Sequence, residues 1–337
     1  DAPTNITLSN NSIPENRIAG SLIGLLSTTD EDVNTFTYTF ASVGTNDNSS
    51  FILSGNELKT NAAFNFESKQ LYVINIQTND GNGGTFVKQF LVNITDSNDA
   101  PTDINISAYL ITENRPANTF IGKLSIVDVD AVQGTNMYSL VNGTGSNNNS
   151  SFIIRNDSLL SNTTFNYEVQ SSFSVRIKAV DNGNLFVEKS FTITVLDSND
   201  MPSGITLSTH SVSENSVIGT TIGTLNTIDS DAGQTFSYAL VGGLGSADNN
   251  LFSIQGASLK TNIVFNYEAR SSYTVRVQTN DGNGGTFTDT FNITILNAND
   301  APTNITLSNN SIPENRIAGS LIGLLSTTDE DVNTFTY

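Results

Sequence analysis

Acidic and amide residues are crowded into a short cluster that returns three times along the chain. The stretch "DSNDAP" occupies residues 96–101, and it recurs as "DSNDMP" at 197–202 and as "NANDAP" at 297–302. Like charges this close together repel, so the crowding needs a compensating partner. Carboxylate and neutral oxygen donors, without histidine or cysteine among them, are ligands of hard divalent cations, and Ca²⁺ accepts a more adaptable oxygen shell than Mg²⁺. The clusters therefore predict cation sites.

Each cluster ends a longer series of acidic landmarks that runs in the same order through successive stretches. The series begins with "PEN", "TEN" or "SEN", then continues through "DED", "DVD" or "DSD", "FNFE" or "FNYE", and "NDGNGG" or "DNGN". The candidate metal ligands in the landmarks and clusters are Asp1, Glu15, Asp30, Asp32, Glu67, Asp80, Asp96, Asp99, Glu113, Asp128, Asp130, Glu168, Asp181, Asp197, Asp200, Glu214, Asp229, Asp231, Glu268, Asp281, Asn297, Asp300, Asp329 and Asp331. Most of the 33 acidic residues belong to this series, which a merely solubilising surface would not require.

The composition excludes several classes of function. With 33 acidic and 14 basic residues, the net charge of -19 would be repelled by nucleic acid and by anionic membranes. No apolar run approaches the ~20 residues of a spanning helix, so no membrane insertion is expected. The chain has no cysteine and one histidine, His210, which leaves a nucleophilic serine without a matched base, and no enzyme is expected. A paired-carboxylate hydrolase stays conceivable, but the clustered acids already have a metal-binding role.

Strands must position these residues, because apolar and polar residues alternate between the landmarks. Examples are "YVINIQTN" (72–79), "FSVRIKAV" (173–180) and "YTVRVQTN" (273–280). Period-two alternation predicts strands with one buried face. About seven such strands in each ~100 residues fit a Greek-key sandwich. We therefore predict an all-β fold of tandem Greek-key, immunoglobulin-type β-sandwich domains in a linear array.

The landmarks predict the domain limits. Repeats are expected at 1–98, 99–199 and 200–299, and residues 300–337 begin a fourth that is identical at every position to residues 1–38. Neighbouring repeats agree mainly at the landmarks, so the full period runs from Asp1 to Asp300 and contains three different domains. Because Tyr337 falls within a predicted strand, we interpret the sequence as a window on a longer periodic object. That object is either one long polypeptide or a polymer of subunits.

Sandwich topology should bring landmarks of successive repeats to the linker between them. The glutamates of "PEN" and "FNFE" are expected at one end of a domain, beside its outgoing cluster, with "DVD" and "DNGN" of the next domain facing them. For the first junction the expected set is Glu15, Glu67, Asp96, Asp99, Asp128, Asp130 and Asp181. About three Ca²⁺ would nearly cancel the charge of these carboxylates.

The order of the landmarks resembles the cadherin repeat, in its bacterial cadherin-like form, over the whole chain. The resemblance implies cadherin-like sandwiches with up to three Ca²⁺ between successive domains, where the metal stiffens the linker. It also implies that the backbone carbonyls of Asn98, Asn199 and Asn299 take part. The family pattern has an acid two residues before Glu67, and the residues at that position of the three repeats are Asn65, Asn166 and Asn266. These three asparagines remain candidate metal ligands because each keeps an oxygen, but each loses a charge, which weakens the case for the outermost ion.

Two further departures from the family pattern affect the linkers. The linker is one residue shorter than in animal cadherins, which changes the expected angle between domains. The third junction has Asn297 where the first two have Asp96 and Asp197, and we predict weaker Ca²⁺ binding there.

Some of these residues also have simpler interpretations. The aspartate of "NDGNGG", such as Asp80, could cap a hairpin turn instead of binding a metal. Phe64, Phe165 and Phe265 are expected in the core and not as ligand-stacking aromatics. His210 has no counterpart in the other repeats and is expected at the surface.

The residues predict an extracellular or cell-surface protein, rigidified by Ca²⁺ and mechanical in function, and the resemblance to the bacterial cadherin-like form implies a prokaryotic source. Extracellular Ca²⁺ would replace the disulfides that the chain lacks. One function is a structural filament in which the repeats associate with further copies of themselves. The alternative is the stalk of a giant Ca²⁺-dependent adhesin, for cell–cell or biofilm attachment, whose binding domain for a cell-surface or matrix partner lies outside this segment. The exact period favours the filament. A weaker third possibility is that loops 44–50 and 143–151 bind a partner or glycan, although they lack aromatic platforms.

Overall fold

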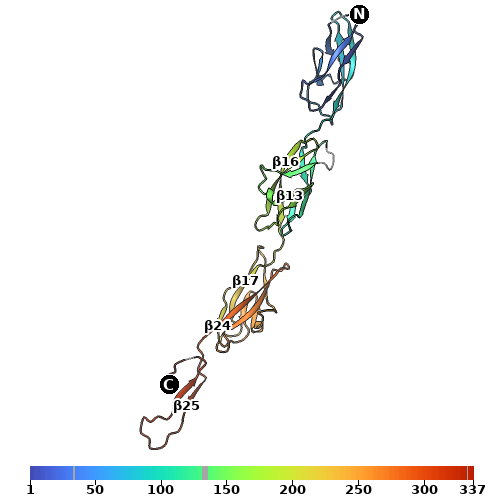
Figure 1. Cartoon of the computed structure of the whole chain (residues 1–337). Helices are drawn as coiled ribbons and strands as arrows, with labels where there is room; N and C mark the ends of the chain where they lie inside the picture. The colour runs from blue at the N-terminus through green and yellow to red at the C-terminus, as the bar shows by residue number, and fades with distance from the viewer. Residues whose placement is uncertain (33–34, 131–135, 332) are drawn as a thin grey trace. The chain divides into compact units, whose positions relative to one another are not determined.

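The computed structural model describes residues 1–32, 35–130, 136–331 and 333–337. Within these residues the regular structure is β-strand, apart from three 3₁₀ turns of three residues each. The prediction of an all-β chain of tandem sandwich domains is confirmed (Figure 1).

The first repeat consists of two four-stranded sheets with strand orders β1-β3-β6-β5 and β2-β8-β7-β4. Its elements are β1 (Asn5–Leu8), β2 (Ser12–Pro14), β3 (Leu22–Thr29), β4 (Thr37–Phe40), η1 (Asn48–Ser50), β5 (Phe51–Ser54), β6 (Glu57–Thr60), β7 (Leu71–Asn79) and β8 (Thr85–Thr95). β7 and β8 form a long antiparallel hairpin from Leu71↔Asn93 to Asn79↔Thr85, while the short β2 runs parallel to the end of β8. The "PEN" and outgoing-cluster landmarks therefore follow two neighbouring strands that end together.

The second and third repeats have the same topology, with sheets β13-β14-β11-β9 and β10-β16-β15-β12, then β17-β19-β22-β21 and β18-β24-β23-β20. The elements of the second repeat are β9 (Asp103–Ile106), β10 (Leu110–Thr112), β11 (Phe120–Val127), β12 (Met137–Leu140), η2 (Asn149–Ser151), β13 (Phe152–Arg155), β14 (Ser158–Ser161), β15 (Ser172–Val180) and β16 (Phe186–Leu196). Those of the third are β17 (Gly204–Leu207), β18 (Ser211–Ser213), β19 (Thr221–Ile228), β20 (Ser237–Leu240), η3 (Asn249–Leu251), β21 (Phe252–Gln255), β22 (Ser258–Thr261), β23 (Ser272–Asn280) and β24 (Thr286–Leu296).

Each repeat has its own apolar core between its two sheets. In the first repeat Phe64 is 5% exposed, and its ring lies 4.6 Å from that of Tyr72 and 5.3 Å from that of Phe51. The corresponding Phe165 and Phe265 are also buried within aromatic trios. The core prediction for these phenylalanines is confirmed, and the rings fix the turn that carries the "FNFE" or "FNYE" glutamate.

A glycine in the strand after each "PEN" landmark marks a break in strand register. In the third repeat the β19–β22 pairing shifts between Thr221 and Gly223. A Cβ on Gly223 would lie 2.6 Å from the Thr209 carbonyl oxygen, closer than real Cβ contacts, so the backbones can pack only around glycine. This bulge follows from close approach, because Gly223 has no left-handed φ.

The chain divides into two compact units. Asp1–Phe165 with Ser172–Val195 form the first, and Asn166–Ser171 with Leu196–Tyr337 form the second. In the second unit, β25 (Asn304–Leu307) and β26 (Leu325–Thr328) pair with the same register as the identical residues of β1 and β3. His210 is exposed, as predicted, and its ring lies 5.8 Å from that of Phe291. None of the helices among the described residues has the length and apolar composition needed to span a membrane.

Candidate metal centre

The glutamate of the "PEN" landmark fastens the outgoing linker to its own domain. Glu15 follows β2 directly and is 2% exposed. Its Oε2 accepts a hydrogen bond from the Phe66 amide at 2.7 Å, and its Oε1 accepts one from the Ser97 amide at 3.1 Å. Glu214 accepts the two corresponding amides at 2.7 and 2.8 Å. These bonds compensate the burial of the charge and place a carboxylate at the end of the domain.

The asparagine of the same landmark holds the linker aspartate. Asn16 has φ 60°, a left-handed conformation that asparagine tolerates better than most residues. Its Nδ2 donates to Asp99 Oδ1 at 2.6 Å, and Asn215 donates to Asp300 Oδ1 at the same distance. Neither asparagine was among the candidate residues, although "EN" stands in each copy of the landmark.

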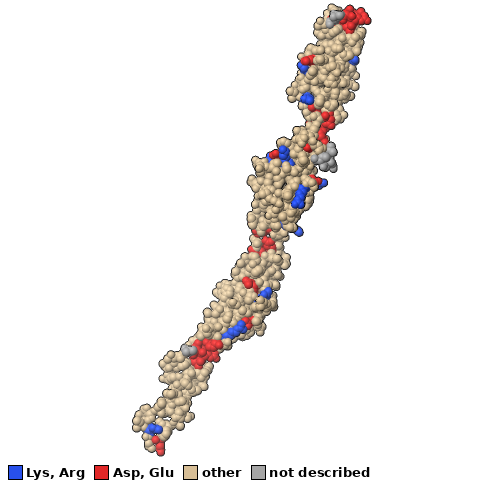
Figure 2. All heavy atoms as spheres, in the orientation of Figure 1, with Lys and Arg blue, Asp and Glu red and all other residues tan. Residues whose placement is uncertain are grey.

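Carboxylates of the first junction converge inside the first unit. Ligand oxygens of Glu15, Glu67 and Asp99 lie within 4.8 Å of one another, as do those of Glu67, Asp96 and Asp130. Glu67 belongs to both groups, so these groups form one continuous acidic cluster. Figure 2 shows acidic side chains gathered beside the linkers, while the sides of the domains carry scattered charges of both signs.

The second unit contains two comparable groups. Ligand oxygens of Glu214, Glu268 and Asp300 lie within 4.8 Å of one another at the third junction, and those of Glu168, Asp197 and Asp231 do so around the second linker. Glu113, the remaining glutamate predicted for the second linker, is 1% exposed and belongs to the first unit.

Two glutamates of these clusters, Glu67 and Glu268, have raised pKa values. A hydrogen bond from its own backbone amide lowers the pKa of Glu67, but desolvation and the charges of Glu15, Asp130 and Asp99 outweigh it and raise the pKa above its ordinary value. Desolvation, followed by the neighbouring carboxylates and opposed by a backbone hydrogen bond, likewise raises the pKa of Glu268. Both side chains therefore lie in negative surroundings that a cation would relieve.

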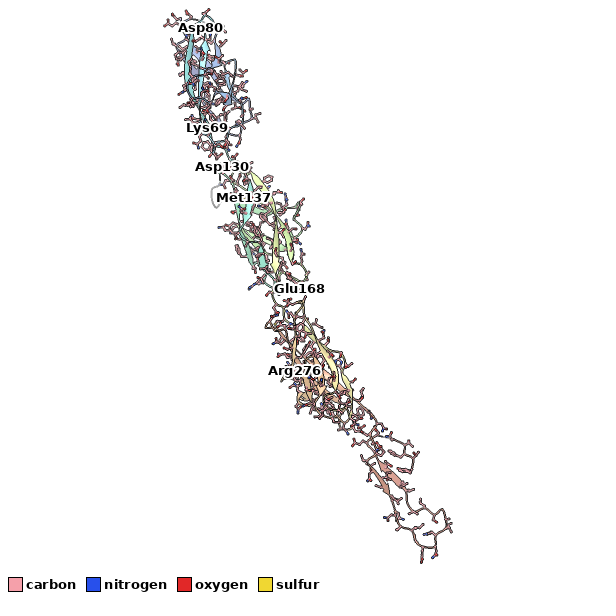
Figure 3. The ribbon with its side chains drawn as sticks, turned by 180° about the vertical axis from the view of Figure 1, so that it is seen from behind. Lys69, Asp80, Asp130, Met137, Glu168 and Arg276 are labelled. Carbon is pink, nitrogen blue, oxygen red and sulfur yellow. The ribbon has the colours of Figure 1, made fainter. Side chains whose placement is uncertain are left out.

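The Asp-X-Asp landmark of the second repeat closes the first junction from the other side. Asp130 Oδ2 accepts the Asp99 amide at 2.5 Å, and the Asp130 amide donates to Asp128 Oδ1 at 2.9 Å. Figure 3 shows Asp80 and Lys69 at opposite ends of the first repeat, with Asp130 beyond the Lys69 end. Around the second linker, Asp231 Oδ2 accepts the Asp200 amide at 2.8 Å.

Two aspartates of this landmark leave an oxygen without a partner. Asp229 Oδ1 and Asp329 Oδ1 accept the amides two residues ahead at 3.0 and 2.9 Å. The Oδ2 of each is buried and has no hydrogen-bond partner among the described residues. A buried carboxylate oxygen without a donor is costly, and a cation would satisfy it without a donor.

The aspartate of "DNGN" and "NDGNGG" both caps its turn and binds the linker. Asp181, 5% exposed, accepts the Leu185 amide on Oδ1 at 2.8 Å and the Asn98 amide group on Oδ2 at 2.9 Å. Asp281 accepts Asn199 Nδ2 at 2.9 Å, and this bond, opposed by desolvation and assisted by backbone amides, lowers the pKa of Asp281. The turn-cap interpretation is therefore compatible with a place at the junction.

Glycines beside these aspartates leave room for the linker. A Cβ on Gly183 would overlap the Asn98 side chain, and one on Gly285 would lie 3.0 Å from Met201 Cα. The glycines of these landmarks are thus required by close approach of the linker, a role that the sequence alone does not reveal.

The asparagines that stand where the family pattern has an acid make hydrogen bonds within their own domains. Asn65 Oδ1 accepts the Ser68 amide at 2.7 Å, and Asn166 and Asn266 accept the corresponding amides at 2.7 and 2.6 Å. Because each side-chain oxygen caps a turn, we leave these three asparagines out of the proposed ligand set.

The N-terminal end of the first repeat carries half of such a cluster. The Asp1 ammonium lies 2.5 Å from Asp32 Oδ2, and this hydrogen bond, with the Asp30 and Asp80 charges adding to it, raises the pKa of the ammonium. The candidate ligands Asp30, Asp32 and Asp80 therefore lie close enough for their charges to act on the Asp1 ammonium.

The donor chemistry fits Ca²⁺. Among the described residues, the converging groups offer carboxylate oxygens, include no histidine or cysteine, and are accompanied by two orphaned buried carboxylate oxygens. At the first junction the residues that would hold the metal are Glu15, Glu67, Asp96, Asp99, Asp128, Asp130 and Asp181.

The comparisons with known proteins agree with the fold. Residues 208–296, which lie in the third repeat, match the Cadherin domain model. Protocadherin gamma-A10 of Pan troglodytes is 25% identical over 279 residues, or 79% of this chain, and protocadherin gamma-A6 of Homo sapiens is 26% identical over 280 residues. The chain spans 29% of the length of each of these relatives.

Solved cadherin structures share the architecture. A structure described as a protocadherin gammaB7 EC3-6 cis-dimer covers 97% of this chain with a TM-score of 0.65 at 20% identity, and 84% of that chain is covered. Mouse cadherin-23 EC22-24 covers 88% of this chain, is itself covered completely, and gives a TM-score of 0.62 at 18% identity.

These findings describe a chain of tandem cadherin-like β-sandwich repeats. The third repeat contains the residues that match the Cadherin domain model, and the first and second repeats have its topology and landmarks. The relatives named above are protocadherins and not enzymes. They come from mammals, so they lend no support to the bacterial form of the resemblance.

Proposed function

We propose that the chain is a Ca²⁺-stiffened spacer region of an extracellular adhesion protein at the cell surface. The domain limits 1–98, 99–199 and 200–299 belong to this proposal. Its support is the cadherin domain in the third repeat and the similarity to protocadherins across 79% of the chain. A binding surface for another cell or matrix would lie in the part of such a protein outside this segment.

The observation that carries the proposal is the convergence of carboxylates at the linkers. Within each unit, acids contributed by a domain, its outgoing linker and the next domain approach within 4.8 Å, and two buried oxygens have no hydrogen-bond partner. Without a cation these groups repel one another across the linker. A bound cation would supply positive charge that all of them share, and mass action would then favour the ordered linker.

The chain's own residues set the geometry for that response. Glu15 fixes the start of the first linker to its domain through the Ser97 amide. Asn98 and the Asp99 amide tie the end of the linker to Asp181 and Asp130 of the next repeat. The linker is therefore anchored on both sides, and loss of the cation leaves only these hydrogen bonds to oppose the charge repulsion.

A second candidate is a filament built of repeated copies. It is favoured by the identity of residues 300–337 with residues 1–38, which a spacer in a single adhesion protein does not require. The described cis-dimer of protocadherin gammaB7 makes association between copies of this chain a reasonable expectation. The prokaryotic source expected from the sequence has no support among the mammalian relatives and is not part of the proposal.

Small-angle scattering and negative-stain microscopy of the purified chain, with Ca²⁺ and with a chelator, test the proposal. We expect the wild-type chain to show a narrower range of particle dimensions in Ca²⁺ than in chelator. The double variant Asp99→Asn, Asp130→Asn should keep, even in Ca²⁺, the broad range of dimensions that the wild type shows in chelator. Asp157→Asn is the matched control, because Asp157 pairs with Lys123 on the side of a domain. Distributions that do not change with Ca²⁺ would contradict the stiffening mechanism, and long uniform filaments would favour the second candidate.

A further inference from the structure

The third junction differs from the first at one position where the side chain would face the cation. Asp96 and Asn297 occupy corresponding positions, each just after the last strand of its repeat. At the first junction Asp96 oxygens converge with those of Glu67 and Asp130. At the third junction, Asn297 Nδ2 instead donates to Glu268 Oε1 at 3.2 Å.

This substitution changes both the charge and the orientation of the donor set. A side-chain amide offers one neutral oxygen in place of two carboxylate oxygens, and here its N–H group donates to a glutamate oxygen that a cation would otherwise use. One negative charge is also lost from the cluster. Among the described residues, the second carboxylate group of the first junction, Glu67 with Asp96 and Asp130, therefore lacks a counterpart at the third.

Other contacts of the third junction match those of the first. Glu214 accepts two backbone amides, as Glu15 does, and Asn215 donates to Asp300 as Asn16 does to Asp99. The Asp300 amide donates to Asp331 Oδ2 at 2.5 Å. The linker therefore keeps its contacts to the third repeat and to Asp331, while the Asn98–Asp181 hydrogen bond of the first junction has no counterpart among the described residues of 300–337. Of the carboxylates that converge at the first junction, Asp96 is the one replaced at the third.

We infer that the third junction is the weak Ca²⁺ site of the chain and loosens first when Ca²⁺ falls. This inference rests on the proposed function and adds a graded response to it. In a chain that repeats with the Asp1 to Asp300 period, one junction in three would act as a hinge at Ca²⁺ levels that keep the others stiff.

Hydrogen exchange measured by mass spectrometry on the whole chain, across a series of free Ca²⁺ concentrations, tests the inference linker by linker. The readout is the Ca²⁺ midpoint for protection of amides 95–99 and 296–300. Changes around metal ligands typically alter affinity by roughly 10-fold to 100-fold, so we expect Asn297→Asp to lower the third-linker midpoint by about that factor. Asp96→Asn should raise the midpoint of the first linker similarly, and Asp157→Asn should change neither.

The outcomes separate the inference from the proposed function. Both positions lie outside the strands, so the variants should keep the wild-type circular dichroism spectrum. An unchanged third-linker midpoint in Asn297→Asp, with a first linker still protected by Ca²⁺, would overturn the inference alone. Exchange independent of Ca²⁺ at both linkers would refute the proposed function and the inference with it.

Discussion

The substitution Glu15→Gln tests whether the buried glutamate holds the linker to its domain. Glu15 is 2% exposed and accepts the Phe66 and Ser97 amides at 2.7 and 3.1 Å. Glutamine keeps one acceptor oxygen but turns an N–H group toward the other amide. One charge-assisted hydrogen bond is then lost and one buried donor is left unpaired, which costs about 2–4 kcal/mol in total.

Hydrogen exchange in saturating Ca²⁺ measures this loss locally. Since each 1.4 kcal/mol is a factor of about ten, amides 12–16 and 96–99 should exchange roughly 30-fold to 1,000-fold faster than in the wild type. The matched control is Glu57→Gln in the same domain. Glu57 pairs with Lys59 at 2.5 Å, but its side chain is 38% exposed. Exposed ion pairs contribute only about 0–1 kcal/mol to stability. Exchange within about threefold of the wild type for Glu15→Gln, or equal effects of the two variants, would refute the reasoning.

Three further predictions concern pH, an ion pair and the core. Desolvation and the neighbouring carboxylates outweigh a backbone hydrogen bond and raise the pKa of Glu67 and of Glu268, so protonation should compete with Ca²⁺. The Ca²⁺ affinity should fall as pH drops through the raised pKa, and calorimetry in buffers of different ionisation enthalpy should detect proton release on binding. Without metal, the stability of the fold should depend on pH in the opposite direction. A carboxyl whose pKa is raised in the folded state gives stability that is lost as pH rises, so the unfolding temperature in chelator should be higher at mildly acidic pH. Arg270 binds the buried carboxylate of Asp248 with two hydrogen bonds of 2.7 Å, so Arg270→Gln should lower the denaturant midpoint of the third repeat. Adding Asp248→Asn gives the third repeat the residue types that the second repeat has at the matching positions, Asn148 and Gln170, and should recover most of the loss. Phe64→Ala should cost about 3–5 kcal/mol in the first repeat, and an unfolding midpoint within error of the wild type would contradict the core assignment.

The fold was readable from the sequence because its determinants are local and repeated. Alternation along residues 72–79 gives β7, and the same pattern in the other repeats gives β15 and β23. Phe64 was assignable to the core because an aromatic residue recurs at the same strand-flanking position in each repeat. Repetition also separated the landmark acids from the scattered ones.

Side-chain hydrogen bonds were not readable in the same way. Asn16 and Asn65 stand near predicted ligands and are chemically alike, yet Asn16 holds the linker aspartate while Asn65 caps a turn. The difference arises from the left-handed φ of Asn16, which the sequence alone does not specify. The requirement for Gly183 likewise depends on where the Asn98 side chain packs, a contact across the linker.

Calorimetric titration of the whole chain with Ca²⁺ at near-neutral pH and moderate salt tests the central claim most directly. The account predicts saturable binding of more than one ion, with dissociation constants of about 10⁻⁴ to 10⁻³ M or tighter, as in extracellular modules, and weaker binding in Asp99→Asn. The absence of saturable binding at roughly ten times that concentration would contradict it.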